Sequence, residues 1–476
     1  MSEDKTRVRF APAPTGMMHL GNIRIALMNY LFAKQKNGSF VLRIEDTDPE
    51  RNFDPGAKKI QEDLSWLHLE PTEGPSAGGP YAPYYQSERT SLYQEKLDYL
   101  ITKKNVYRCF CSPEELDKKR KRQIALKMPP RYDRTCLELS ENEIEQKLQN
   151  NIPFVWRFKI SPDQVITVHD LAKGKINFEM NNFSDFPVTR TNGTFTFLFA
   201  NAIDDILMQI NHVLRGEDHL SNTANQAAIV LALGGSLPIY WHLPILCNIN
   251  GKKLSKRDFG FSLRDLKDAG FLPEAIDNYL AIIGGSFEHE IMNLNQLVTS
   301  YDFESISQSG SIKYDVDKLK WVNHKWIERY EPKDLASVTL PFLIKEYPQA
   351  EHLNHAKLVQ LLQTIKSEMI TLQDSVEAAR FYFEPPQIAE KDIIDAISEQ
   401  TYLNCKKIIL NNLGAIRDEE SFLNTIKSDA KKDSIKAKDL FLVLRMVLMG
   451  AKYGPSIGDV LTLLGHEESK RRIEAL

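Results

Sequence analysis

Long apolar runs, a surplus of one charge and a secretory start are all absent from this sequence. No stretch of its 476 residues approaches the ~20 consecutive apolar residues that a membrane-spanning helix needs. The first ten residues, MSEDKTRVRF, lack the basic start and apolar block of a secretory signal. We therefore expect a cytoplasmic protein with no membrane partner.

Cysteine is scarce as well: there are five, and this odd number argues against a disulfide framework. Lysine and arginine (60) nearly balance aspartate and glutamate (64), which gives a formal net charge of −4. Such a balance does not exclude a nucleic-acid partner, because phosphate binding needs only a local basic surface. Internal repeats and low-complexity tracts are also missing, so a repeat architecture is excluded.

What is present is enough chain for about two to four domains, since 476 residues exceed what one hydrophobic core supports. Residues 8–10 form a short extended run, a Pro/Gly turn follows, and apolar residues then recur at helical spacing from Ile23 to Leu31. The β-rich segment SFVLRIEDTD comes next and ends in carboxylates. This order of strand, loop, helix and strand predicts a nucleotide-binding βαβ unit.

The pattern changes further along the chain. Residues 71–85 are rich in Gly and Pro and predict a loop, and residues 105–190 combine three cysteines with a basic run and strand-like pieces. That mixture indicates an inserted subdomain. The α/β character resumes over residues 196–234, and helical patterns predominate beyond about residue 320. The sequence therefore predicts an interrupted α/β domain followed by an all-α domain.

The first segment with candidate chemistry is RFAPAPTGMMHLGN, residues 9–22. It places Gly16 in the turn after the first strand, and His19 and Gly21 at the start of the helix. Backbone N–H groups and the positive end of the helix dipole attract phosphate there, and a histidine could donate to phosphate oxygens in a transition state. The alternative is an ordinary loop with a surface histidine.

The second segment is GKKLSKRD, residues 251–258, which crowds four cations around a serine. Cations repel one another at this spacing unless an anion joins them. A loop of this kind suits adenylate chemistry, in which a carboxylate attacks the α-phosphate of ATP and pyrophosphate leaves. A solvated basic turn is the alternative for this loop taken alone.

Together the two segments resemble the HIGH and KMSKS signatures of the class I aminoacyl-tRNA synthetases, at residues 19–22 (HLGN) and 253–257 (KLSKR). Within that class the sequence resembles the glutamyl-tRNA synthetase family over essentially its whole length. The motifs that carry the resemblance include LRIEDTD at 42–48, YQSER at 85–89, VLRGEDHLSNT at 213–223 and GFLPEAIDNYLAIIG at 270–284.

The resemblance implies an α/β fold with a Rossmann-type catalytic domain, an inserted tRNA acceptor-binding subdomain and an all-α anticodon-binding domain. The expected boundaries are 1–105 and 191–250 for the two halves of the catalytic domain, 106–190 for the insertion, 251–320 for the KMSKS loop and stem-contact region, and 321–476 for the anticodon-binding domain. It also implies that a monomeric enzyme ligates L-glutamate to tRNA(Glu) through glutamyl-adenylate, with ATP and Mg²⁺.

Site residues follow from the same resemblance, position by position. The implied catalytic residues are His19, Lys253 and Lys256, and the implied ATP-binding residues are Thr15, Gly16, His19, Gly21 and Lys256. The implied glutamate-binding residues are Arg9, Ala11, Ala13, Glu45, Phe197, Asn201 and Arg215. An arginine is physically suited to the substrate's side-chain carboxylate, because its planar fork binds a carboxylate bidentately and rewards glutamate over glutamine.

Three positions depart from the family pattern. The family commonly has serine where Ala13 stands and tyrosine where Phe197 stands, so two hydroxyls are missing. If each hydroxyl donated to a charged group of the substrate, its loss would cost roughly 1.5–3 kcal/mol, or ten-fold or more in affinity. Asn22 replaces the second histidine of the signature, a change that the bacterial family tolerates.

The cysteines of the expected insertion form a third candidate site. Cys109, Cys111 and Cys136 follow a C-x-C-x24-C pattern, and Tyr132 and Glu138 flank the last of them. Three thiolates and one further ligand would make a closed tetrahedral zinc site, although buried free cysteines are the alternative. Zinc occurs at the matching place in some members of the resembled family. The neighbouring basic run KKRKR, residues 118–122, is either a contact for acceptor-stem phosphates or a solvated helix face.

Other functions remain open from the sequence. A glutaminyl or nondiscriminating synthetase would differ in anticodon contacts that the sequence does not identify. A catalytically inactive tRNA-binding relative would explain the two missing hydroxyls but not the retained His19, Lys253, Lys256, Glu45 and Arg215. A tRNA-base-glutamylating relative lacks a helical C-terminal domain, and a small-molecule adenylyltransferase would have no use for one. The aromatic run FYFEPP at 381–386 is either a base-stacking surface or, as we favour, core packing.

Overall fold

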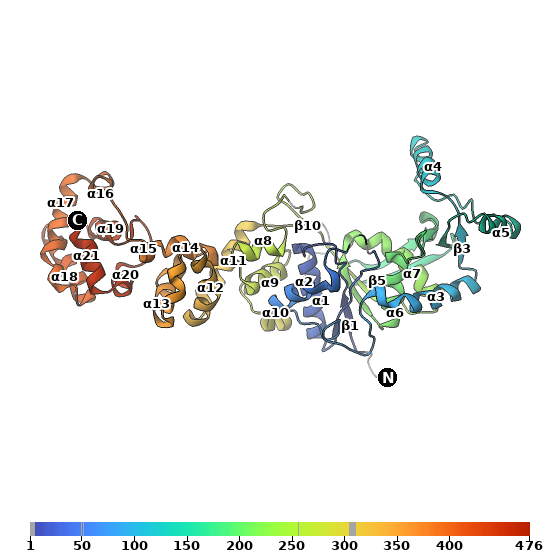
Figure 1. Ribbon diagram of the computed structural model, residues 1–476, viewed down its shortest axis with the longest axis horizontal. Helices are drawn as coiled ribbons and strands as arrows, with labels where there is room; N and C mark the ends of the chain where they lie inside the picture. The colour runs from blue at the N-terminus through green and yellow to red at the C-terminus, as the bar shows by residue number, and fades with distance from the viewer. Residues whose placement is uncertain (1–4, 49, 51, 256, 304–310) are drawn as a thin grey trace. The chain divides into compact units, whose positions relative to one another are not determined.

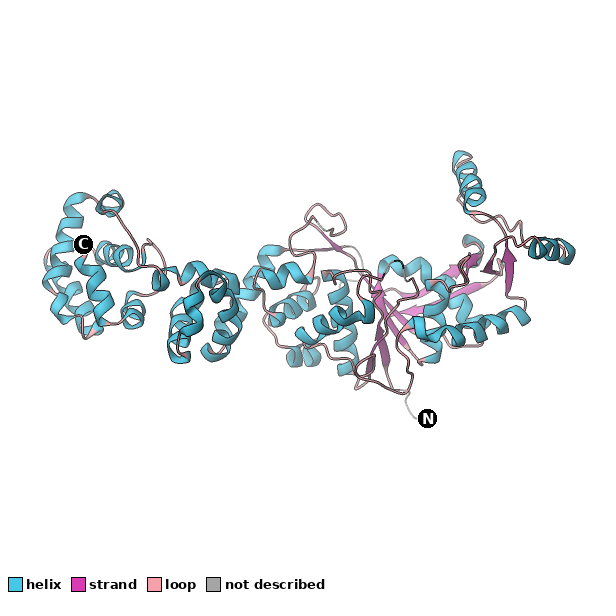
Figure 2. Ribbon diagram, viewed as in Figure 1, coloured by secondary structure: helices cyan, strands magenta, loops and turns pink. Residues whose placement is uncertain are grey.

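The computed structural model describes the chain except for residues 1–4, 49, 51, 256 and 304–310. It divides into two compact units: Met1–Asp265 with Asp277–Asp315, and Leu266–Ile276 with Val316–Leu476. Among the described residues, every strand belongs to the first unit, whereas the second unit is built from helices and loops (Figure 2). None of the helices in these residues is long and apolar enough to cross a membrane.

The first unit opens with the expected strand–helix–strand arrangement (Figure 1). Strands β1 (Arg7–Phe10) and β2 (Ser39–Leu42) pair in parallel, and helix α1 (Leu20–Gln35) connects them. The register sets Phe10 opposite Leu42, so the carboxyl ends of both strands lie at the same edge. Residues that follow the two strands are therefore brought close together, which is how a parallel α/β sheet builds a ligand site.

The second half of the α/β fold comes from α6 (Phe197–Leu207), β8 (His212–Gly216), α7 (Leu220–Ala232) and β9 (Ile239–Leu243). Its sheet has the strand order β6-β5-β9-β8, in which β8 and β9 are parallel. The hairpin of β5 (Val165–Asp170) and β6 (Gly174–Glu179) falls within the expected insertion, residues 106–190. Nevertheless Asp170 pairs with Tyr240 of β9, so this hairpin is part of the main sheet.

A separate antiparallel sheet carries the rest of the insertion. It has the order β3-β4-β7, with β3 (Val106–Cys109), β4 (Val155–Phe158) and β7 (Phe186–Pro187). Between β3 and β4 the chain forms α4 (Pro113–Ala125) and α5 (Glu141–Gln149), which project from β3 in Figure 1. Neither helix contains a buried residue, so both are largely solvated.

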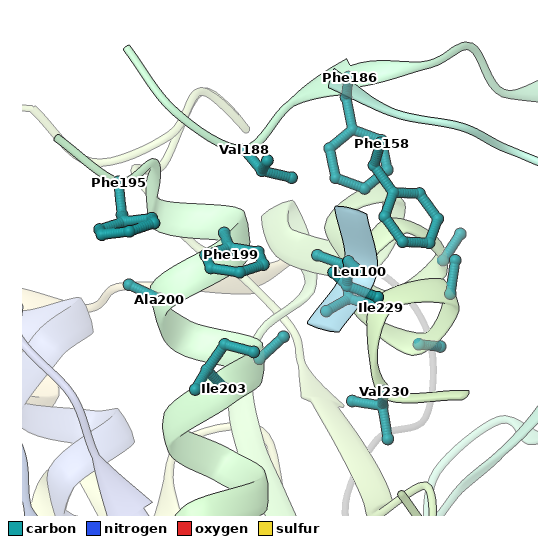
Figure 3. Close-up of a cluster of buried hydrophobic side chains, with 14 of the residues drawn as sticks. Leu100, Phe158, Phe186, Val188, Phe195, Phe199, Ala200, Ile203, Ile229 and Val230 are labelled. Atoms are coloured by element: carbon teal, nitrogen blue, oxygen red, sulfur yellow. The ribbon is translucent and has the colours of Figure 1, made fainter. Parts of the chain in front are cut away.

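A hydrophobic core joins the three-stranded and four-stranded sheets of the first unit through α3 (Thr90–Thr102), α6 and α7 (Figure 3). Phe195 and Phe199 stack with ring centroids 5.4 Å apart, and Phe158 stacks on Phe186 at 5.3 Å. Each fully buried side chain of this size contributes about 1.5–3 kcal/mol to folding. This core packs α6 against the sheet, and the first five residues of α6 include two of the expected glutamate-site residues, Phe197 and Asn201.

The remaining elements of the first unit are α2 (Lys58–Trp66), β10 (Leu246–Cys247), α10 (Leu294–Ser300) and β11 (Ile312–Lys313). Helices α8 (Leu263–Asp268) and α9 (Pro273–Ile282) contain residues of both units.

The second unit consists of short amphipathic helices. Helix α18, for example, begins at an Asp418 cap and buries Phe422, Ile426 and Ala430 at four-residue spacing. In the run FYFEPP, Phe381 is buried and Phe383 stacks on Tyr347 at 4.5 Å, so these rings contribute to packing. The helices of the unit are α11 (Val316–Arg329), α12 (Pro332–Glu346), α13 (His355–Ile365), α14 (Ser375–Ala378), α15 (Arg380–Phe383), α16 (Glu390–Ile397), α17 (Glu399–Asn411), α18 (Glu419–Lys432), α19 (Ala437–Met449), α20 (Ile457–Leu464) and α21 (His466–Glu474).

Candidate active site

The carboxyl ends of β1, β2 and β8 surround a cavity of about 410 Å³ in the first unit. All seven residues expected to bind glutamate line this cavity, together with Thr15 from the expected ATP site. The cavity lies where the parallel strands end, the usual position of a ligand site in an open α/β sheet.

Arg215, at the end of β8, is the most unusual charge in the cavity. Its guanidinium is buried, and neutral groups hold it: Nη1 donates to Gln226 Oε1 at 2.6 Å and Nη2 donates to Thr223 Oγ1 at 2.6 Å. Nε has no hydrogen-bond partner among the described residues. Burial, reinforced by the charge of Arg9, lowers the pKa of Arg215 to about 10. A buried cation held in this way is stabilised when an anionic ligand enters the cavity.

A chain of hydrogen bonds continues from Arg215 across the floor of the cavity. Gln226 Nε2 donates to Asn201 Oδ1 at 2.8 Å, and Asn201 Nδ2 donates to Glu45 Oε1 at 2.5 Å. Burial raises the pKa of Glu45 despite the opposing charge of Arg43. Glu45 and Arg215 thus give the cavity a carboxylate and a guanidinium, linked through Gln226 and Asn201. Such a cavity suits a substrate that carries both an amino group and a carboxylate.

Two further arginines, Arg9 and Arg43, form ion pairs with one carboxylate, that of Asp205. Asp205 of α6 accepts from Arg43 Nη1 at 2.6 Å and from Arg9 Nε at 3.2 Å. Burial would raise the pKa of Asp205, but the two guanidinium groups hold that pKa below its usual range. Arg9 therefore reaches the cavity with its orientation set by a buried ion pair.

His19 caps the amino end of α1 and is oriented by it. The backbone N–H of Asn22 donates to His19 Nδ1 at 3.3 Å, so the neutral ring carries its proton on Nε2. The Asn22 side chain completes the capping box by accepting from the His19 N–H at 3.4 Å, which gives a role to the residue that replaces the second signature histidine. The ring also stacks on Phe261 at 5.2 Å. Burial, and then the charge of Lys253, lowers the pKa of His19.

Gly21 has a steric reason to be glycine. A Cβ atom at this position would lie 3.1 Å from two atoms of the His19 ring, which folds over the first turn of the helix. Gly16 adopts a positive φ of 146° in the preceding turn, a conformation that glycine adopts without strain. The expected ATP residues Gly16, His19 and Gly21 lie beside the cavity and are not part of its lining.

Of the two expected catalytic lysines, the structure describes one. Lys253 Nζ lies 2.9 Å from Asp218 Oδ2, just beyond β8, and both side chains are substantially exposed. His19 is close enough for both charges to influence its pKa. Lys256 lies outside the described residues.

The two positions with missing hydroxyls face the cavity as expected. The Phe197 ring lies 5.6 Å from the His219 ring, which also lines the cavity. Asn222 Nδ2 contacts His219 Nδ1 at 3.1 Å; because an amide nitrogen donates, the neutral His219 ring keeps its proton on Nε2. Burial, followed by the charge of Arg215, lowers the pKa of His219 to about 4. His219 is thus a neutral hydrogen-bond donor beside the missing Tyr hydroxyl.

The three cysteines of the insertion come together. The Sγ atoms of Cys109, Cys111 and Cys136 lie within 4.8 Å of one another, and those of Cys111 and Cys136 are 3.6 Å apart. The Tyr132 hydroxyl is 3.3 Å from Cys109 Sγ and 3.8 Å from Cys111 Sγ. The structure does not bring Glu138 into this group: its side chain is exposed on the loop beyond Cys136.

The protonation of the cluster reflects crowding of sulfur atoms. Burial and the neighbouring thiols raise the pKa of Cys111 to about 12. Burial has the same effect on Cys109, but the Tyr132 hydrogen bond and the charge of Arg157 hold the pKa of Cys109 below its usual value. Three sulfur atoms at these separations could hold a metal ion, and thiolates are common ligands of closed structural zinc sites.

Several residues of the site were missed by the sequence analysis. Thr223 and His219 fall within the motif VLRGEDHLSNT and could have been found there. Arg43 falls within the motif LRIEDTD and could have been found in the same way. Asp205 and Gln226 had no comparable signal, because a buried polar network depends on packing that a single sequence does not display.

The fold and the site together define a nucleotide-binding synthetase with a helical C-terminal unit, and family matches agree. Residues 5–321 match the family described as tRNA synthetases class I (E and Q), catalytic domain, and residues 334–476 match the Anticodon binding domain. The chain belongs to the class I tRNA synthetases for glutamate and glutamine.

The individual proteins that this chain resembles are named as glutamate–tRNA ligases. The glutamate–tRNA ligase of Finegoldia magna is 36% identical over 487 residues, covering 99% of each chain, and that of Sulfurihydrogenibium sp. is 38% identical over 475 residues, covering 98% of each. The crystal structure of a glutamate tRNA ligase from Elizabethkingia meningosepticum in complex with its amino acid matches with a TM-score of 0.87 and 31% identity, over 99% of both chains. These matches confirm the family and the fold class that the sequence predicted.

Proposed function

We propose that this chain is a glutamate–tRNA ligase, which joins L-glutamate to tRNA(Glu) in an ATP-dependent reaction that releases AMP and pyrophosphate. The observation that carries the proposal is Arg215: a buried guanidinium, held by Gln226 and Thr223, that lines a cavity large enough for an amino acid. A carboxylate side chain compensates this charge and an amide does not, so the site favours glutamate over glutamine. The curated relatives named glutamate–tRNA ligase support the same reaction.

In the proposed binding mode the substrate spans the cavity. Its side-chain carboxylate pairs with Arg215, and its amino group lies against Glu45, which Asn201 holds in place. Arg9 supplies a second cation for the substrate, while Ala11, Ala13 and Phe197 contribute apolar walls. This places the α-carboxylate toward the amino end of α1, where ATP would bind over Thr15, Gly16 and Gly21.

The first chemical step is attack by the α-carboxylate oxygen on the α-phosphorus of ATP, with breakage of the bond to the leaving pyrophosphate. Negative charge grows on the phosphoryl oxygens in this transition state. The Nε2–H of His19 donates to these oxygens, and Lys253 and Lys256 neutralise the phosphates. Mg²⁺, when bound to ATP, supplies further charge neutralisation. In the second step a hydroxyl of the terminal adenosine of the tRNA attacks the glutamyl carbonyl and AMP leaves.

A structural zinc ion in the insertion belongs to the same proposal. The thiolates of Cys109, Cys111 and Cys136 and the oxygen of Tyr132 would hold it, and the short sulfur–sulfur separations support this set. Such an ion would fix the loop that carries Cys136 to the end of β3 and take no part in the reaction. A monomeric state, tested by light scattering, is the remaining part of the proposal.

The decisive experiment is charging with labelled glutamate on purified transcripts of the glutamate and glutamine tRNAs, with ATP and magnesium. Charging of the glutamate tRNA alone establishes a discriminating ligase, and charging of both tRNAs establishes a nondiscriminating one. Absence of charging on either transcript and on total bacterial tRNA would contradict the proposed function.

A further inference from the structure

Behind Arg215 lies a buried polar chain that the proposed mechanism does not use. It starts at Asp170, the last residue of β5, whose carboxylate accepts four hydrogen bonds. Oδ1 accepts from the backbone N–H groups of Ala172 and Lys173, each at 2.9 Å. Oδ2 accepts from the backbone N–H of His242 at 3.0 Å and from its Nδ1 at 2.7 Å. The carboxylate is therefore rigidly placed and fully occupied.

The chain continues from His242 to Arg215. His242 Nε2 lies 2.7 Å from Thr223 Oγ1, and this same oxygen accepts from Arg215 Nη2 at 2.6 Å. Thr223 is fully buried, and the exposed fractions of His242 and Asp170 are 1% and 4%. Four side chains thus form one continuous line from β5, inside the four-stranded sheet, to the glutamate cavity at the end of β8.

The directions of these hydrogen bonds follow from the charges. Burial, with the charge of Arg215, lowers the pKa of His242 and outweighs the hydrogen bond to Asp170, which raises it, so the ring is neutral. Its single proton lies on Nδ1, because the Asp170 carboxylate can only accept there. Nε2, at 2.7 Å, then accepts from the Thr223 hydroxyl in preference to the His219 carbonyl oxygen at 3.3 Å, and the lone pairs of Oγ1 are free to accept from Arg215.

We propose that Asp170, His242 and Thr223 are positioning residues that fix the guanidinium of Arg215 for the substrate carboxylate. The inference rests on the proposed function and names specificity-determining residues for the same site. Thr223 acts directly on Arg215, and His242 and Asp170 act through Thr223. Among the described residues no carboxylate forms an ion pair with Arg215, whereas Arg9 and Arg43 share Asp205. The hydrogen bonds that orient Arg215 in this part of the chain therefore come from neutral groups.

A packing role and a positioning role predict different kinetics. If these three side chains only fill space, removing the Thr223 hydroxyl should change the stability of the protein and leave the KM for glutamate and the KM for ATP unchanged. If they position Arg215, loss of that hydroxyl should raise the KM for glutamate selectively, because ATP does not contact Arg215 in the proposed mode. A hydrogen bond to a charged group is worth about ten-fold or more in affinity, which sets the expected size.

The test is steady-state charging by the full chain carrying Thr223→Val, with Thr223→Ser as the rescue and Thr339→Val as the matched control. Thr339 is equally buried but lies in the second unit, in α12. We expect Thr223→Val to raise the KM for glutamate about ten-fold and to leave the KM for ATP within about two-fold. Thr223→Ser and Thr339→Val should each stay within about two-fold of the unmodified chain.

A coupling measurement tests the order of the chain and provides a second variant should Thr223→Val fold poorly. His242→Phe removes both ring nitrogens and should raise the KM for glutamate selectively. Since His242 acts through Thr223, adding His242→Phe to Thr223→Val should cause no further increase.

An unchanged KM for glutamate in both single variants, equal changes in the two Michaelis constants, or additive effects in the double variant would overturn the inference. The unmodified chain is assayed alongside in every case. If it charges no glutamate, the proposed function fails, whereas normal charging by the unmodified chain with unaffected variants overturns the positioning role alone.

Discussion

The Nζ atom of Lys253 lies 2.9 Å from a carboxylate oxygen of Asp218, so a lysine of the KMSKS-like loop is bound to an acid at the end of β8. Both side chains are more than 40% exposed, and exposed pairs of this kind add little stability. The contact is therefore easily exchanged for a phosphate. Asp218 thus keeps Lys253 near His19, whose pKa both charges influence.

Replacing Lys253 tests this contribution to catalysis. We expect Lys253→Ala to reduce glutamyl-tRNA formation about 100-fold, the scale for loss of one charge partner in a transition state, and Lys256→Ala to reduce it at least as much. Lys252→Ala, in an exposed neighbour of the same charge, should retain most of the activity. Initial rates at saturating substrates measure the effect, and near-normal turnover would remove the substituted lysine from the mechanism.

Restoring a missing hydroxyl should strengthen substrate binding. Phe197→Tyr places a phenol oxygen in the cavity, next to the neutral His219 donor. If that oxygen reaches a charged group of glutamate, the KM for glutamate should fall about ten-fold, while the KM for ATP should not change. Ala13→Ser should act in the same direction. An unaltered or higher KM for glutamate in both variants would mean that the cavity has already compensated for these hydroxyls.

Acid should destabilise the chain partly through His219. Its folded-state pKa of about 4 lies below the ordinary value of 6.5, because burial and Arg215 disfavour the imidazolium. The unfolded chain therefore binds a proton between these values when the folded chain does not, and the stability that His219 contributes above pH 6.5 is lost as the pH falls toward 4. His219→Gln removes this pH-dependent contribution to stability.

We expect the melting temperature of His219→Gln to fall less between pH 7.5 and pH 5 than that of the unmodified chain. His19 and His242, whose pKa values are also lowered, remain in both proteins and cancel in the comparison. An equal fall in melting temperature for the two proteins between pH 7.5 and pH 5 would show that protonation of His219 does not destabilise the fold.

Metal content should depend on the cysteine cluster and on no other cysteine. Protein purified without added zinc should contain about one equivalent, and Cys136→Ser should contain much less, because a closed tetrahedral site needs every ligand. Cys405→Ser is the matched control, since Cys405 is also buried but lies in α17 of the second unit. Equal metal content in the two variants, or none in the unmodified chain, would show that the three thiols only pack.

The parts of the fold that could be predicted were those with a local signal. Periodic apolar residues predicted α1 and the helical second unit, and the turn chemistry around Gly16 predicted the loop that joins β1 to α1. The seven expected glutamate-binding residues were named from motif resemblance, and the structure places all of them around one cavity. That they bind glutamate stays a prediction.

The hairpin of β5 and β6 shows where such prediction fails. Its residues follow the cysteine cluster along the chain, and nothing in their alternation of polar and apolar side chains indicates which sheet they join. Only the pairing of Asp170 with Tyr240 decides that question, and pairing between distant strands is a property of the whole fold. The same pairing delivers Asp170 to His242, so the sequence analysis could not include either residue.

The register of β3 and β4 also has a consequence for protein engineering. Cys109 lies opposite Val155, so the intervening residues 110–154 leave the sheet and return to it at adjacent backbone positions. A two-residue turn could bridge that point and convert β3 and β4 into a plain hairpin. The excursion could therefore be exchanged between homologues, provided that the replacement supplies a cation for the buried Asp185, which Arg134 of the excursion binds at 2.8 Å.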